Sequence, residues 1–177
     1  MYHPPPPLHP KFAFIDLFAG IGSFGIAMQN LCGRCIFSSE WDDKSQKTYE
    51  ANLGDTPFGD ITNPKTKSFI RQQFDILCAG FPCQAFSIAG KRGGFDDIRG
   101  TLFFDVAEII KNHQPKAVFL ENVKGLISHD QGRTLKTILN VLKDDLGYSV
   151  SEVRTMNAKD FGVPKIGSVF ILLRLGI

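Results

Sequence analysis

Short apolar runs alternate with helix-like segments along most of the chain, and this alternation constrains the fold more than any other feature. The runs that we predict as strands are 12–18, 34–39, 74–79, 117–120 and 148–155. The segments predicted as helices are 24–31, 43–52, 101–112 and 133–146. Apolar strands alternating with amphipathic helices predict an α/β fold with a doubly wound, mostly parallel sheet. We expect Asp43 to cap the second helix, Gly147 to end the last, and Val169 to Leu173 to form a final strand.

Residues 1–11 are predicted to form a disordered, proline-rich tail, and residues 12–177 a single domain. The hydrophobic fraction of 43% and the net charge of +2 exclude disorder as the dominant state. No apolar stretch reaches the roughly 18 residues that a membrane span requires. The tail lacks the apolar region of a secretory signal, so we expect a reducing cytoplasm and free cysteines. The overall charge neither favours nor excludes a nucleic-acid partner.

Ligands of such sheets bind beyond the carboxyl ends of the strands. A glycine-rich turn, Gly20 to Gly22, follows the first predicted strand, and Gly25 comes three residues after Gly22; we do not interpret this turn as a full dinucleotide fingerprint. The turn lets a ligand approach the backbone closely, although plain strand-to-helix turns also contain glycine. The function of the turn therefore depends on what lies beside it.

Polar and aromatic residues follow the second predicted strand and the next turn. Glu40 can bind ribose hydroxyls, and Trp41 can stack on a flat heterocycle. The alternative is a core tryptophan beside a helix-capping acid. Asp60 and Ile61 could bracket an adenine with one polar and one apolar group. Together these residues favour an adenosine ligand without a pyrophosphate, which describes S-adenosylmethionine better than a nicotinamide dinucleotide.

Chemistry-bearing residues follow the third and fourth predicted strands. Cys83 lies behind Pro82 among polar neighbours, which is typical of a poised nucleophile. The alternative, a buried small hydrophobe, suits Cys78 inside its strand. Glu121 ends the next strand and should face the same edge of the sheet, unless it is a solvated loop acid. Cys83 and Glu121 are therefore the candidate catalytic pair.

The four cysteines and four histidines do not predict a metal site. Cys32 and Cys35 have a spacing that invites a zinc or redox interpretation, but they flank a helix end and a strand start. The histidines show no ligand spacing. We interpret the thiols other than Cys83 as core groups and expect no metal.

Six runs of residues, in order and at characteristic spacing from Phe12 to Pro164, resemble the bacterial-type DNA cytosine-5 methyltransferases of restriction-modification systems. They are Asp16-Leu-Phe-Ala-Gly20, Glu40-Trp-Asp42, Gly59-Asp-Ile-Thr62, Gly80-Phe-Pro-Cys-Gln-Ala-Phe-Ser87, Arg99-Gly-Thr-Leu-Phe103 and Glu121-Asn-Val123. The resemblance implies a Rossmann-like, S-adenosylmethionine-dependent methyltransferase fold. It also implies bacterial cytoplasm as the location and double-stranded DNA as the partner.

The resemblance further implies a covalent mechanism on a cytosine that has left the base stack. The Cys83 thiolate would attack C6, and C5 would then take the methyl group, leaving S-adenosylhomocysteine. Glu121 would hold the N3 edge of the base. The remaining roles implied are cofactor binding by Phe18, Gly20, Ile21, Gly22, Glu40, Trp41, Asp60, Ile61 and Leu102, and substrate binding by Gln84, Ser87 and Arg99.

The sequence departs from the family pattern after Pro164. The family continues there with a Gln-Asn-Arg-Glu-Arg type segment and a target recognition domain, whereas this chain reads Lys165-Ile-Gly-Ser-Val169. Deleting one base from codons for the family segment reproduces residues 164–173, so we hypothesise a frameshifted remnant; the alternative is a natural split enzyme. Without the recognition domain, we expect weak or absent methyl transfer by this chain alone and a complementing chain as a possible partner.

Two other functions remain open from the sequence. An RNA cytosine-5 methyltransferase would use the same cysteine chemistry. The chain could also be a non-catalytic half that binds only cofactor or a partner chain. Such a protein would use the cofactor-binding residues but not Cys83.

Overall fold

The computed structural model describes residues 7–82, 102–162 and 168–175. The chain divides into two compact units, Met1–Gly80 and Phe81–Ile177. Within the described ranges, no helix combines the length and the apolar character that crossing a membrane requires.

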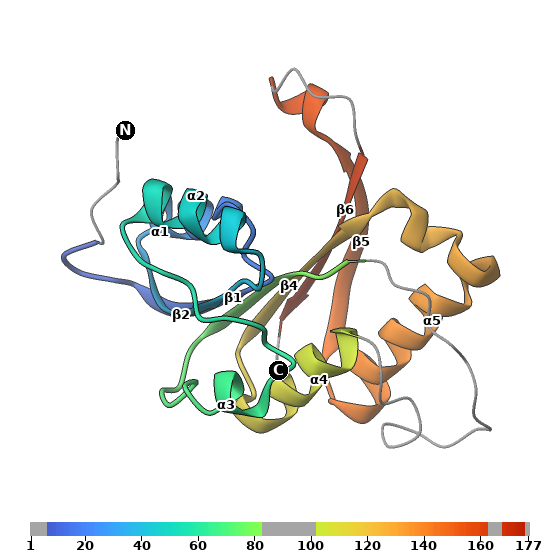
Figure 1. Cartoon of the computed structure of the whole chain (residues 1–177). Coiled ribbons are helices and arrows are strands. Elements are labelled where there is room, and N and C mark those ends of the chain that lie inside the picture. Colours follow the sequence, from blue (N-terminus) through green and yellow to red (C-terminus); the bar gives the residue numbers. More distant parts are fainter. Residues whose placement is uncertain (1–6, 83–101, 163–167, 176–177) are drawn as a thin grey trace. The chain divides into compact units, whose positions relative to one another are not determined.

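The first unit is built around three parallel strands. Its elements are β1 (Phe12–Leu17), α1 (Ser23–Asn30), β2 (Gly33–Ser39), α2 (Asp43–Leu53), α3 (Pro64–Lys67) and β3 (Ile76–Gly80). β1 lies between β2 and β3 and pairs in parallel with both, as Figure 1 illustrates. The carboxyl ends of the three strands therefore meet at one edge, as the alternation in the sequence predicts.

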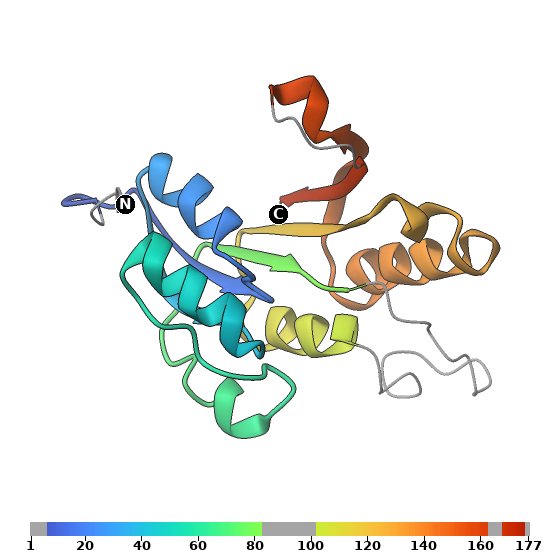
Figure 2. The same ribbon diagram turned by 45° about the horizontal axis from the view of Figure 1, so that its top comes forward.

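Helices α1 and α2 pack against each other through glycine. A Cβ atom on Gly25 would lie 2.6 Å from Leu53 Cδ1, and one on Gly22 would lie 2.7 Å from the same atom. Tyr49 and Leu53 of α2 are buried in this contact with Ala19. The short α3, which the sequence analysis did not predict, lies apart from this helix pair (Figure 2). Gly22 and Gly25 therefore have a packing role in addition to any role in ligand binding.

The cap of α2 differs from the sequence prediction. The side chain of Asp42, and not that of Asp43, accepts a hydrogen bond from Ser45 N at 2.8 Å. Asp42 has extended backbone angles, whereas Asp43 already lies within the helix. The prediction of an Asp43 cap is therefore wrong by one residue. The capping residue is the last one before the helix, and α2 already includes Asp43.

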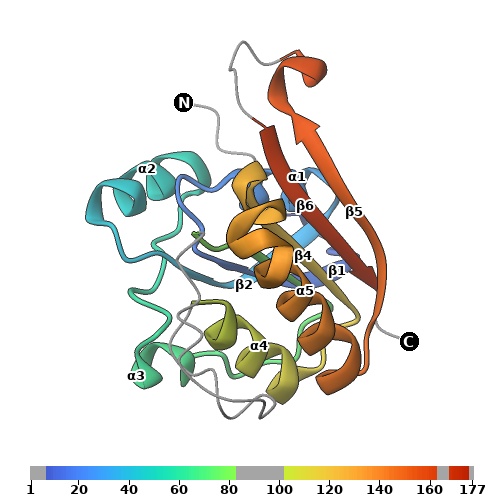
Figure 3. The ribbon, with the colours of Figure 1, turned by 90° about the vertical axis from the view of Figure 1, so that its right-hand side faces the viewer.

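The second unit combines helices with an antiparallel group of strands. Its main elements are α4 (Leu102–His113), β4 (Ala117–Val123), α5 (Arg133–Asn140), β5 (Ser149–Asn157) and β6 (Ser168–Leu175). Short helical turns are η1 (Lys124–Ile127), η2 (His129–Gly132), η3 (Val141–Asp145) and η4 (Ala158–Phe161). β6 lies between β4 and β5 and is antiparallel to both, and Figure 3 shows β5 and β6 side by side.

The strands and helices predicted from the sequence are present, with boundaries shifted by a few residues. β6 includes the predicted run Val169 to Leu173, and Gly147 adopts the positive φ of 70° expected after a helix. The predicted helix 133–146 is α-helical only to Asn140 and continues as the π-helical turn η3. The parallel pairing expected for the sheet is found in the first unit, whereas both strand pairings described within the second unit are antiparallel.

The helix α4 is amphipathic. Phe103, Val106, Ala107 and Ile110 recur at helical spacing and are buried. Glu108 and Lys111 lie on the exposed side. This apolar face explains why the sequence pattern located the helix correctly.

Candidate functional site

The turn between β1 and α1 exposes its backbone at the carboxyl edge of the first unit. Phe18, Gly20 and Gly22 all have positive φ, at 53°, 55° and 93°. Ala19 N donates to Ser39 O at 2.9 Å, which fixes the turn against the end of β2. A Cβ on Gly20 would have no atom within 4 Å, so this face of the turn is open. An open backbone face is what close approach of a ligand requires.

Glu40 joins the turn to the start of α2. Its Oε2 accepts from Gly20 N at 2.8 Å, and its Oε1 accepts from Asp42 N at 2.9 Å. The side chain is buried, and Gln46 Nε2 donates to the Glu40 carbonyl. A carboxylate oxygen can accept more than one hydrogen bond, so both oxygens can still receive a ligand hydroxyl. Glu40 is therefore fixed in place for binding without being saturated.

Trp41 lies on the surface. Its side chain is 73% exposed, so the alternative of a core tryptophan is wrong. Ile21, in the turn, is also exposed. Two apolar side chains in solvent next to a fixed carboxylate form a surface of the kind on which flat heterocycles stack.

The turn that contains Asp60 is held by aromatic stacking and backbone hydrogen bonds. Phe58 N donates to Ser38 O, and Glu40 N donates to Phe58 O, both at 2.8 Å. The Phe58 ring stacks at 4.9 Å between centroids on Phe37 and, on its other side, on Phe69. These contacts attach the turn directly to the residue before Trp41.

Beyond Phe58, Asp60 and Ile61 differ in exposure. Asp60 is exposed and its Oδ1 accepts from Thr62 N at 2.9 Å, whereas Ile61 is only 2% exposed. The polar side chain is therefore exposed and the apolar one buried, and the bracketing of an adenine by Asp60 and Ile61 stays a prediction.

Asp16, at the end of β1, is an additional residue of this edge that the sequence analysis assigned no role. Its side chain is fully buried, and Oδ2 accepts from Gly25 N in the first turn of α1 at 3.1 Å. The other oxygen, Oδ1, is buried without a hydrogen-bond partner among the described residues. Burial raises the pKa of Asp16 to about 7, the Gly25 N–H lowers it, and Glu40 raises it further. The sequence signal that could have identified Asp16 is an acid that interrupts an apolar strand directly before a glycine-containing turn.

In the second unit, β4 carries Glu121 and Asn122 near its end. Glu121 is half-buried, and burial raises the pKa of its carboxyl group. Asn122 is buried, and its Nδ2 donates to the Phe81 carbonyl at 2.7 Å. Phe81 also packs its ring against Phe103 of α4, at 5.7 Å between centroids. The residue beside Glu121 is therefore bonded to the segment that leads into Cys83.

Several predicted site residues lie outside the described residues. These are Cys83, Gln84, Ser87 and Arg99. Leu102 is described and begins α4, where it is half-buried.

The other cysteines and the charged residues do not form a metal centre in the part of the chain that the structure describes. No group of three His, Cys, Asp or Glu side chains is close enough together there to hold an ion. Cys78 is fully buried in β3, and Cys35 Sγ donates to the Phe37 carbonyl at 3.4 Å. Burial, first of all, raises the pKa of Cys35 to about 12, so this thiol stays protonated near neutral pH.

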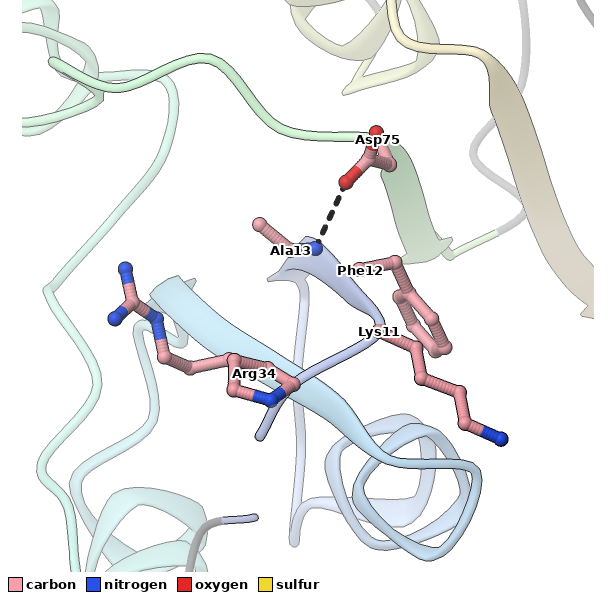
Figure 4. Close-up of a pocket in the computed structure, with 6 residues that line it drawn as sticks. Lys11, Phe12, Ala13, Arg34 and Asp75 are labelled. Atoms are coloured by element: carbon pink, nitrogen blue, oxygen red, sulfur yellow. Dashed lines mark hydrogen bonds between the residues drawn. The ribbon is translucent and has the colours of Figure 1, made fainter. Parts of the chain in front are cut away.

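A separate shallow pocket lies at the opposite ends of β1 and β2, at the start of these strands. Its volume is about 310 Å³, and its lining residues are Pro10, Lys11, Phe12, Ala13, Arg34 and Asp75 (Figure 4). Asp75 is the acidic residue of the lining. Its Oδ2 accepts a hydrogen bond from Ala13 N at 2.9 Å, which ties the side chain to the backbone of β1. The pocket contains none of the predicted site residues.

Solved structures identify the class to which this fold belongs. A DNA modification methyltransferase encoded within an E. coli prophage superposes with a TM-score of 0.73 and 22% identity, covering 94% of this chain and 47% of the other. The Dnmt2 methyltransferase of S. pombe gives a TM-score of 0.69 at 19% identity, covering 93% and 51%. The chain therefore shares the Rossmann-like α/β fold of these methyltransferases.

The sequence identifies the family within this class. Residues 12–166 match the family model of the C-5 cytosine-specific DNA methylases, and the chain belongs to that family. It is 76% identical over 160 residues to the type II methyltransferase M.HpaII of Haemophilus parainfluenzae, and 51% identical over 152 residues to M.HhaI of Haemophilus parahaemolyticus. These matches cover 90% and 86% of this chain. The chain spans 45% of the length of each of these two relatives.

Proposed function

We propose that residues 12–177 form the catalytic and cofactor-binding domain of a DNA cytosine-5 methyltransferase of a restriction-modification system in the bacterial cytoplasm. The observation that carries the proposal is the position of Glu40, whose two carboxylate oxygens bridge Gly20 N and Asp42 N at the carboxyl edge of β1 and β2. Family membership supports the reaction, and the exposed Trp41 beside Glu40 supports a nucleoside ligand at this edge.

The residues of this edge fit S-adenosylmethionine. The open face of Gly20 leaves room for a ligand against the backbone, and the Asp16 Oδ1 atom is a buried acceptor without a partner among the described residues. In the proposed site, Phe18, Gly20, Ile21 and Gly22 form the wall, Glu40 binds the ribose hydroxyls, and Trp41, Asp60, Ile61 and Leu102 surround the adenine side. When bound, S-adenosylmethionine supplies an electrophilic methyl group and leaves as S-adenosylhomocysteine.

The proposed chemistry belongs to Cys83 and Glu121. The Cys83 thiolate forms a bond to C6 of a flipped cytosine, and the displaced electron pair makes C5 nucleophilic enough to accept the methyl group. Loss of the C5 proton then allows the C6–S bond to break and restores the thiolate. Glu121 holds a proton at the N3 edge during the addition, which its raised pKa favours. Gln84, Ser87 and Arg99 contact the DNA around the base.

In this proposal, the DNA sequence is recognised by a target recognition domain on another chain. The chain spans 45% of M.HpaII, so a complementing chain with the target recognition domain would supply contacts to double-stranded DNA. The part of M.HpaII outside the match is the reagent of choice for a reconstitution, because M.HpaII is 76% identical to this chain over the matched residues.

The test measures transfer of labelled methyl groups from S-adenosylmethionine to duplex DNA. We expect weak or absent transfer by the chain alone and clear transfer after addition of the M.HpaII part. Cys83→Ser should abolish that transfer, and Glu121→Gln should lower it by about 100-fold or more. The exposed Asp144→Asn is the matched control. Transfer that survives Cys83→Ser would contradict the proposed nucleophile, and strong methylation by the chain alone would contradict the need for a complement.

A further inference from the structure

Asp16 presents an unusual combination of burial, bonding and position. It lies at the end of β1, directly before the turn that contains Gly20, and its side chain has no exposed surface. One carboxylate oxygen accepts a single backbone hydrogen bond from Gly25, and the other has no partner among the described residues. A buried carboxylate with an unpaired oxygen is costly, so such a group in a native structure needs an explanation.

The groups that face Asp16 are acids or neutral groups. Cys35 faces it from β2, Glu40 from the segment between β2 and α2, Tyr49 from α2 and Cys78 from β3. From α1 it receives only the Gly25 N–H, because α1 contains no ionisable residue. Burial raises the pKa of all three other groups, Cys35, Tyr49 and Cys78, so they remain protonated between about pH 6 and pH 8.5. Asp16 is thus the group of this cluster whose titration we expect near neutral pH.

The two carboxylates are bonded to the same turn and to the helix that follows it. Glu40 accepts from Gly20 N inside the turn, and Asp16 is bonded to the helix that follows the same turn. None of the electrostatic contributions to Asp16 within the described part of the chain comes from a cationic side chain. A cationic ligand at this turn would favour the ionised form of Asp16, and ionised Asp16 would favour that ligand in return.

We propose that Asp16 is a specificity-determining residue whose negative charge makes this edge prefer the sulfonium-bearing methyl donor over its uncharged thioether product. The proposal rests on the proposed function and extends it to product release. Methyl transfer converts the positively charged sulfur of the donor into a neutral thioether, so the attraction to Asp16 falls at that step. The preference is present when Asp16 is ionised and is lost when it takes up a proton.

The direction of the pH effect follows from the raised pKa. Below about pH 7 Asp16 is protonated in the free chain, and donor and product differ little in their interaction with it. Above that pH the carboxylate attracts the sulfonium ion. The ratio of the product dissociation constant to that of the donor should therefore increase with pH.

Isothermal calorimetry of the full chain tests the proposal with S-adenosylmethionine and S-adenosylhomocysteine as separate titrants, at pH 6.0 and pH 8.5. We expect the ratio of dissociation constants to rise about ten-fold between the two pH values in the unaltered chain. Asp16→Asn should flatten this rise, and the exposed Glu50→Gln should preserve it. Titration of the ligands themselves is common to all three proteins and cancels in the comparison.

A flat ratio in the unaltered chain, or a rise that persists in Asp16→Asn, would overturn the role of Asp16 and leave the proposed function standing. Failure of both ligands to bind at either pH would instead overturn the proposed function and the role of Asp16 with it. Carbon-13 NMR of the aspartate carboxyl groups in the unaltered chain keeps the test open if Asp16→Asn does not fold. Saturation with S-adenosylmethionine should lower the pKa of Asp16 more than saturation with S-adenosylhomocysteine, and equal effects would contradict the proposal.

Discussion

The two units hold their acidic side chains in different ways. In the first, backbone N–H groups bind the carboxylates, because Glu40 accepts from Gly20 and Asp42, and Asp16 accepts from Gly25. In the second, Glu121 is half-buried, and no residue of the described ranges donates a hydrogen bond to its carboxylate. The first unit thus fixes Glu40 and Asp16 with its own backbone, whereas the Glu121 carboxylate has no such donor in the described part of the second unit.

This difference separates binding from catalysis. A prearranged carboxylate binds a ligand with little further loss of side-chain conformational entropy. A half-buried acid without a donor keeps its proton more easily, which suits a group that must share a proton with a base. We therefore expect the carboxylates of the first unit to serve in binding the cofactor and Glu121 to serve in sharing a proton with the base.

The largest effect on stability that we expect from this comparison comes from Asp16. Because its pKa is raised from 3.8 to about 7 in the folded chain, the folded state binds a proton more tightly than the unfolded state. The resulting stabilisation is fully present below about pH 4 and is lost as the pH rises through about 7, on the order of a few kcal/mol in total. Melting curves should show this loss, and Asp16→Asn should reduce it.

Two other groups must be separated from this effect. Burial raises the pKa of Glu121, which acts in the same direction, and lowers that of His113, which acts in the opposite direction. Both are unchanged in Asp16→Asn, so the difference between the two stability curves isolates Asp16. A difference that does not vary between pH 5 and pH 8 would contradict the account of this buried acid.

A smaller effect is expected from the hydrogen bond that supports the segment before Cys83. Asn122→Ala removes the donor to the buried Phe81 carbonyl and should lower the free energy of unfolding by about 1–3 kcal/mol. Urea titration monitored by circular dichroism measures the change, and the exposed Val123→Ala is the control. Binding of S-adenosylmethionine should be unaffected, since Asn122 is not among the proposed cofactor-binding residues; a matching loss of binding would contradict that assignment.

The smallest effect is expected from Trp41. Because its side chain is 73% exposed, Trp41→Ala should leave the melting temperature almost unchanged. Loss of ring stacking should weaken S-adenosylmethionine binding by about 1 kcal/mol, or roughly five-fold. The exposed Leu31→Ala in the same unit should change neither quantity. A marked fall in stability without a change in affinity would assign Trp41 to packing and remove it from the site.

The sequence predicted the elements well where one physical signal dominates. The apolar spacing of Phe103, Val106 and Ile110 located α4, and the mostly apolar run of β1 located a buried strand. The pattern could not locate the cap of α2, because Asp42 and Asp43 are adjacent residues with the same side chain. It also could not predict η3, because a π-helical turn differs from an α-helix in hydrogen bonding and not in which residues are apolar.

The candidate site was predictable in part for a similar reason. Acidic and aromatic residues at strand ends, such as Glu40 and Trp41, stand out from the apolar strands before them. The role of Asn122 in binding the Phe81 carbonyl depends on residues 41 positions apart, which no local pattern connects. Asp16 was visible as part of a motif, but its unpaired oxygen and raised pKa arise from burial by several elements. Such properties follow from packing and not from spacing.

The most direct test of the central claim is calorimetric titration of the full chain with S-adenosylmethionine, compared with Glu40→Ala and Glu50→Ala. The account predicts one binding site in the unaltered chain and in Glu50→Ala, and an affinity lower by about ten-fold or more in Glu40→Ala, because that change removes charge-assisted hydrogen bonds. Equal affinity in all three proteins, or no binding by the unaltered chain, would contradict the assignment of this edge as the cofactor site.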